Sequence, residues 1–113
     1  AITRAQVTNS QIKTELVLAD RKDAFMVPRD APVVRYTSAA WERIMHRPTV
    51  YSGGSWLADT ASMGAFVETV IFGPGGDPVY QPNESLEITD IERACQINAL
   101  TVAMALVPEM SDV

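Results

Sequence analysis

The pattern of apolar positions gives its clearest helical signal near the C-terminal end of the chain, over residues 89–107. Thr89 and Glu92 have the spacing of a capping box, in which each side chain satisfies a backbone N–H of the other residue. From Ala94 onward nearly every residue is apolar or small. A helix that is apolar on nearly all sides is normally covered on nearly all sides. We therefore predict a helix over about 89–107 whose apolar sides pack against more than one other element.

Few other elements are available in a chain of 113 residues to surround such a helix. Two arrangements would cover it: a sheet with loops over its back, or a second copy of the chain. The pattern leaves both open, and the second predicts self-association. The residues expected to form the self-association surface are Ile91, Ala94, Ile97, Leu100, Met104 and Val107.

Several short segments have the alternation or the branched residues that are typical of strands. Residues 12–19 alternate, residues 24–27 would return as the second strand of a hairpin, and residues 33–36 would form another strand. Residues 65–72 match helical spacing, but their shortness, their branched side chains and the Gly-Pro turn after them favour a strand.

A short helix is expected at about 38–46, with Thr37 or Ser38 as its cap. Its face would be formed by three residues at i, i+3 and i+4, namely Trp41, Ile44 and Met45. The predicted fold class is therefore α+β: a small, mostly antiparallel sheet with this short helix and the C-terminal helix.

Length predicts a single domain over residues 1–113, and the polar residues 1–11 would form an arm that is disordered alone or pinned to a partner. Nine Lys and Arg against fourteen Asp and Glu give a net charge of −5, which argues against a dedicated nucleic-acid binder. A basic patch within residues 21–47 stays open as an alternative. Its residues would be Arg21, Lys22, Arg29, Arg35, Arg43 and Arg47.

The candidate chemistry is sparse. Cys95 is the only cysteine, so neither an intrachain disulfide nor a thiolate metal site is expected, and an apolar helix would make it inert. His46 is the only histidine and falls where a helix should end, which favours a capping or surface role. We expect no cofactor, no metal and no catalytic set. An enzyme would have to use His46 or Glu68 as its base.

A glycine-rich stretch between two aromatic residues is the best candidate for a contact loop, although a bulge or a turn would have the same composition. The residues of this candidate loop are Tyr51, Gly53, Gly54 and Trp56. No signal peptide is visible at residues 2–10, and the C-terminal helix contains Asp90 and Arg93, so it does not have the composition of a membrane span. A cytoplasmic or virion location is expected.

Four pieces of the chain resemble a pattern in small phage-encoded proteins of unassigned function. They are Thr49-Val50, Trp56-Leu57, Phe66 to Gly73, and the spacing of Asp90, Glu92 and Ala94. In that family a T-V-W-L strand precedes an F-E-T-M-V-F strand and a helix with an acidic start. This chain departs from the pattern by the insertion at 51–55 and by lacking a His in its final helix. The resemblance covers about half the chain; it implies an α+β fold and a viral origin, and no activity.

These observations favour a non-enzymatic small protein that acts through protein–protein contacts, as a homo-oligomer or in a larger assembly. A self-assembling phage or viral structural or accessory protein fits this description. The alternative is a small non-catalytic subunit or regulator of a larger enzyme complex, which would use the same surfaces with an unlike partner. A stand-alone enzyme is the third hypothesis, and it depends on His46 or Glu68.

Overall fold

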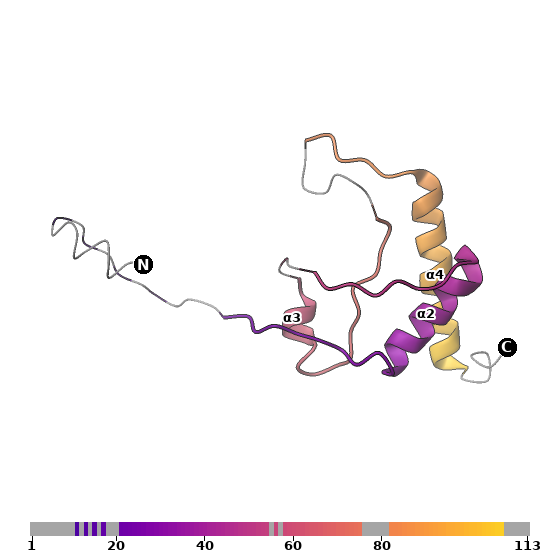
Figure 1. The fold of residues 1–113 in the computed structure, drawn as a ribbon, viewed down its shortest axis with the longest axis horizontal. Helices are drawn as coiled ribbons and strands as arrows, with labels where there is room; N and C mark the ends of the chain where they lie inside the picture. The colour runs from indigo at the N-terminus through magenta and orange to yellow at the C-terminus, as the bar shows by residue number, and fades with distance from the viewer. Residues whose placement is uncertain are drawn as a thin grey trace.

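The computed structural model of the chain describes residues 11, 13, 15, 17, 21–54, 56, 58–75 and 82–107. In this part of the chain there are three helices and no strand (Figure 1). The helices are α2 (Pro32–Met45), α3 (Thr60–Met63) and α4 (Ile88–Leu106). The described fold is therefore helical, and the predicted α+β class with its antiparallel sheet is wrong.

The predicted strand at 33–36 is the first part of α2, which begins six residues before the expected start at 38. Pro32 occupies the first helical position, where its fixed φ suits a helix and its missing N–H costs nothing. Thr37 is thus an interior residue rather than a cap, and its hydroxyl donates to the Val33 carbonyl oxygen at 2.7 Å. At the other end, Met45 is within one residue of the expected end.

The remaining predicted strands are not formed in the described residues. Residues 24–27 are irregular, and residues 13, 15 and 17 are the only described members of the expected strand at 12–19, none of them in a strand. Residues 65–72 are irregular after a turn that continues α3, in which Phe66 N–H donates to the Met63 carbonyl at 2.9 Å. Strand propensity alone forms no ladder, because each strand needs a partner at the right register. The predicted arm at 1–11 lies outside the described residues except for Gln11.

Helix α4 matches the predicted C-terminal helix to within one residue at each end. Its start differs in detail, since Glu87 is the N-cap and no side chain caps the helix. Thr89 is already the second helical residue, so it cannot take the cap position that the predicted capping box assigns to it. Asp90 instead accepts from Arg93 at 3.3 Å, an exposed pair one turn apart.

The core lies where α2 packs against α4 (Figure 1). Ala40 of α2 is fully buried beneath Ile97 and Met104 of α4, which are 1% and 2% exposed. Half-buried side chains surround these three: Tyr36, Ala39, Trp41, Ile44, Met45, Phe72 and Leu100. Because Ala40 has only a methyl group, it leaves room for the larger side chains of the facing helix.

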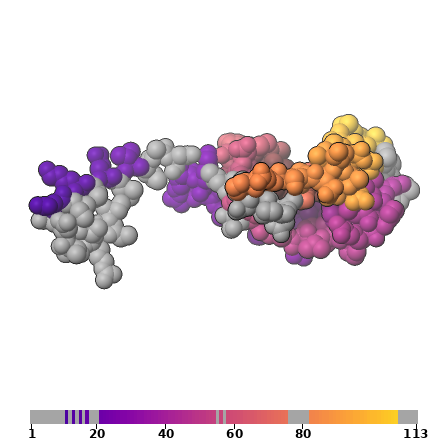
Figure 2. All heavy atoms as spheres, turned by 90° about the horizontal axis from the view of Figure 1, so that it is seen from above, coloured from indigo at the N-terminus to yellow at the C-terminus, as the bar shows by residue number. Residues whose placement is uncertain are grey.

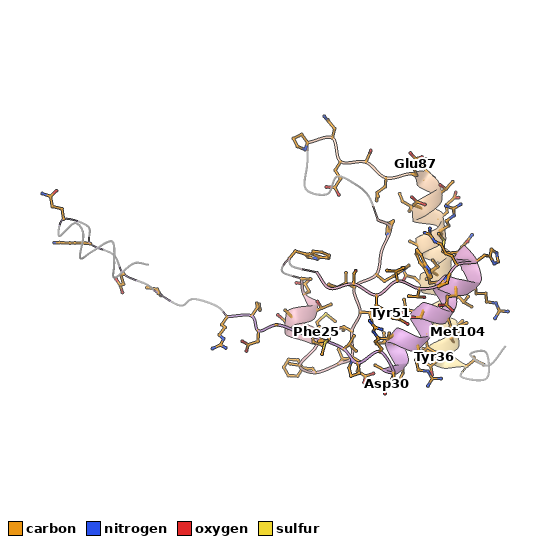
Figure 3. The ribbon with its side chains drawn as sticks, viewed as in Figure 1. Phe25, Asp30, Tyr36, Tyr51, Glu87 and Met104 are labelled. Atoms are coloured by element: carbon orange, nitrogen blue, oxygen red, sulfur yellow. The ribbon has the colours of Figure 1, made fainter. Side chains whose placement is uncertain are left out.

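Two contacts tie the irregular segments to the helices. The Phe72 ring meets Trp41 edge to face, with centroids 6.1 Å apart, and this attaches the segment after α3 to the core. Phe25 lies beside α3 (Figure 3), and its ring covers Gly64 so closely that a Cβ at Gly64 would overlap it. The missing side chain at Gly64 is therefore what allows the N-terminal segment to cross α3.

Candidate protein-contact surface

The side of α4 that faces away from α2 carries a continuous line of exposed apolar and small residues. At 100° per residue they fall within one narrow sector of the helix. We call this line the outer stripe; its residues are Ile88, Ile91, Cys95, Ala99, Val102 and Leu106. Figure 2 looks down on the start of α4, so the helix, coloured orange to yellow, is seen nearly end-on, with magenta residues below it in the view. Helix α2 is the element that α4 contacts.

The outer stripe is well exposed along its length. Ile88 at one end is 72% exposed and Leu106 at the other end is 77% exposed. Between them Ile91 is 44% and Val102 57% exposed. Scattered apolar residues are normal on a protein surface, whereas large contiguous apolar patches are typical of interaction sites.

The structure divides the predicted self-association residues between the two sides of α4. Ala94, Ile97 and Met104 are buried on the side of α4 that packs on α2. Leu100 is half-buried, and Ile91 and Val107 are exposed at 44% each. The sequence pattern could not separate these sides, since both carry apolar residues at spacings of three and four.

Sequence reasoning missed most of the outer stripe, although its spacing is visible in the chain. Ile88, Val102 and Leu106 were not among the expected surface residues, and Cys95 was expected to be buried and inert. The thiol is in fact on an exposed residue. Cys95 is exposed because its position on α4 is opposite the side that packs on α2, and it lies near the middle of the stripe.

The predicted contact loop is anchored at one end by α2. The Tyr51 hydroxyl and Ser38 Oγ are 2.9 Å apart, and the Arg29 guanidinium lies 4.8 Å from the Tyr51 ring centroid. Trp56 is 53% exposed, and its ring folds back against Gly54, where a Cβ would be only 2.8 Å away. A Cβ added at Gly53 would meet no described residue within 4 Å. Two half-exposed aromatic rings are therefore presented here, one of them held by polar contacts.

An open hollow of about 260 Å³ lies at the end of α2, lined by Ile44, Met45, His46, Arg47 and Arg93. His46 is exposed and follows the helix with left-handed backbone angles, φ 53° and ψ 35°. No carboxylate lines the hollow to orient the imidazole as a base. Glu68, the other candidate base, is exposed on the irregular segment after α3.

In the part of the chain that the structure describes, potential metal ligands are dispersed and several basic residues contact near neighbours. Among the residues that the structure describes, no three His, Cys, Asp or Glu side chains come together as metal ligands would. Arg21 pairs with Asp23 at 2.8 Å, and Arg47 lies 5.1 Å from the Trp41 ring centroid. With Arg29 on Tyr51, three of the bases in residues 21–47 are engaged by near neighbours.

Comparison with known proteins adds no relative: no family model matches the chain, and no curated protein or solved structure is significantly similar to it. Within the described residues, none of the helices combines the length and apolar character that crossing a membrane requires.

Proposed function

We propose that the chain is a non-enzymatic protein that acts through protein–protein contacts, by self-association through the outer stripe of α4. The single observation that carries this proposal is the exposed apolar line from Ile88 to Leu106 on a helix whose other side already packs on α2. A viral structural or accessory role, which the resemblance to small phage-encoded proteins implies, stays a prediction, because the strands of that pattern are not formed in the described residues.

The driving force for this self-association is the removal of apolar area from water. Fully burying a Leu, Ile or Val side chain is worth about 1.5–3 kcal/mol, and the stripe holds four of them at 44–77% exposure. Part of this gain is offset by the lost freedom of the two chains. The stripe also lacks a charged residue at any of its six positions, so its burial leaves no charge unpaired.

Val102→Glu tests the proposal, because it places a carboxylate within the stripe, and at 57% exposure the charge can stay in water in the folded monomer. Val50→Glu is the matched control, an 86% exposed valine outside α4. Sedimentation velocity from micromolar to hundreds of micromolar should show a dimer or larger species for the parent chain and for Val50→Glu. Val102→Glu should sediment as the 12.3 kDa monomer with unchanged helical circular dichroism.

A parent chain that stays at 12.3 kDa across the whole concentration range would rule out self-association. If Val102→Glu and Val50→Glu weaken the assembly equally, the contact lies elsewhere. An unlike partner that co-purifies with the parent chain at a fixed ratio, and is lost with Val102→Glu, would assign the stripe to a hetero-complex instead.

A further inference from the structure

We propose that a second copy of the chain covers the outer stripe with its own α4 running in the opposite direction. The twofold axis then passes between Cys95 and Ala99, level with residue 97 along the helix but on the opposite side from the buried Ile97 side chain. This inference rests on the proposed self-association and names its geometry. In an interface of this kind the same patch on each copy must be complementary to itself.

The order of side-chain sizes along the stripe makes the stripe complementary to an antiparallel copy of itself. Counted from residue 97, Ile88 and Leu106 are equally far from the centre, nine residues on either side. Cys95 and Ala99 are also equally far, at two residues. Ile91 and Val102, at six and five residues, differ by one position. An antiparallel copy therefore sets large side chains against large ones at both ends and small ones against small ones at the centre.

The small residues at the centre determine how closely the helices approach. Packed helix axes lie about 8–10 Å apart, according to the side chains at the contact. Cys95 and Ala99 allow the lower end of this range, so that the longer side chains at the ends can reach across. The reverse order, with large residues in the centre, would hold the two stripes apart.

Charge separates the antiparallel arrangement from the parallel one. The acidic residues Glu87, Asp90 and Glu92 gather at the start of α4, and residues 94–106 carry no charge. Parallel pairing would bring two acidic helix starts together, with their dipoles aligned. Antiparallel pairing about residue 97 separates equivalent acidic residues by about 15–30 Å along the helix axis, which exceeds the screening length of about 8 Å at physiological salt.

Two amides flank the stripe one residue from its centre. Gln96 lies on one flank and Asn98 on the other, and both are exposed. In an antiparallel pair each flank meets the same flank of the second copy. Each amide then lies within reach of its own counterpart, and an amide can both donate to and accept from another amide. Polar pairs of this kind at the centre of a helix contact specify its register.

The contact area that two stripes can bury limits how tightly the two copies bind. One helix stripe about 28 Å long buries less than the roughly 800 Å² per partner of a standard interface. We therefore expect a reversible dimer with a dissociation constant in the micromolar range.

Cross-linking between two single-cysteine chains tests the direction of pairing. In a Cys95→Ala background, one chain carries Ile88→Cys and the other Leu106→Cys, and a short bifunctional maleimide is added to each alone and to their mixture. Antiparallel pairing predicts a cross-linked dimer in the mixture and at least tenfold less in either chain alone. Parallel pairing predicts the reverse: each chain cross-links to itself and the mixture gives no hetero-dimer.

A second measurement leaves the stripe intact apart from its central thiol. Thr89 is exposed on α4 away from the stripe, so a nitroxide on Thr89→Cys in the Cys95→Ala background reports the distance between copies. Antiparallel pairing places the two helix positions about 24 Å apart along the axis, whereas parallel pairing sets them side by side. Short distances, or self-cross-linking of Ile88→Cys alone, would overturn the inference.

The two proposals fail in different ways. A parent chain that remains a monomer in sedimentation refutes the self-association itself. A parent chain that forms a dimer, together with a short nitroxide distance or no hetero-dimer in the cross-linked mixture, refutes only the antiparallel geometry.

Discussion

Ala40, Ile97 and Met104 have the least exposed side chains that the structure describes, at 0%, 1% and 2%. Their burial depends on a size match across the contact between α2 and α4. Ile97 fills the space that the methyl group of Ala40 leaves, so the contact requires a large side chain at position 97 and a small one at position 40. A smaller residue at 97 leaves a cavity, and a larger one at 40 pushes the helices apart.

Ile97→Ala should lower the free energy of unfolding by about 2–5 kcal/mol, because it removes buried methylene groups and leaves a void. Ala40→Leu should cost about 1–3 kcal/mol by overpacking. The measurement is urea unfolding followed by circular dichroism at 222 nm, a standard wavelength for helix. Ile71→Ala, at a 58% exposed isoleucine outside α4, is the control and should change stability far less. Equal losses at 71 and 97 would contradict the core described above.

At the scale of elements, the two long helices end in different ways. Helix α2 closes on His46, whose N–H donates to the Glu42 carbonyl at 2.9 Å while its backbone adopts left-handed angles. Glu42 also holds the next segment, since its Oε1 accepts from Thr49 N–H at 3.0 Å. Helix α4 begins at Ile88, and its N-cap residue Glu87 makes no side-chain hydrogen bond to the first turn. The end of α2 is therefore the better defined of these two helix termini, at a cost in backbone strain.

His46→Gly should raise the free energy of unfolding by about 1 kcal/mol, because glycine adopts φ 53° without a steric penalty and an L-residue does not. His46→Ala is the control: it removes the imidazole but keeps the Cβ, so it should not stabilise. Thermal and urea unfolding of the two variants check this. Equal effects of Gly and Ala would show that the imidazole, and not the backbone, is what matters at this position.

At the scale of the whole molecule, apolar residues are plentiful and burial is scarce. The chain is 47% hydrophobic. Within the described residues the buried core consists of Ala31, Val34, Ala40, Ala94, Ile97 and Met104. Large side chains such as Met26 and Phe66 are 89% and 91% exposed. One helix pair does not cover this much apolar surface, and in our proposal a second chain supplies the further burial.

The thermal midpoint of unfolding should therefore rise with protein concentration, because a partner that binds only the folded chain stabilises it by mass action. Scanning calorimetry or circular dichroism over a hundredfold range of concentration measures the shift. Val102→Glu should unfold at a midpoint that is independent of concentration and equal to the parent midpoint at high dilution. A parent midpoint that does not move with concentration would contradict coupling between folding and association.

Local features of the sequence determined the two long helices well. The apolar spacing placed α4 to within one residue, and the end of α2 followed from the spacing of Trp41, Ile44 and Met45. The start of α2 was also encoded, by Pro32 as a first helical residue, but proline is equally a sign of interrupted strands. The strand prediction for residues 33–36 is wrong because the branched Val33 and Val34, which favour strands locally, lie in the first turn of this helix.

Only the tertiary structure decided which side of α4 is covered within the chain. Both sides have apolar residues at helical spacing, and the choice between Ile97 and Val102 depends on where α2 packs. The failed strands have the same explanation: residues 24–27 and 65–72 have strand composition, but a strand exists only when another segment pairs with it. Helices form from hydrogen bonds within one segment, so local sequence predicts them further than it predicts sheets, although it missed the start of α2 and all of α3. Surfaces and sheets depend on distant segments, and for the outer stripe that segment is in our proposal a second copy of α4.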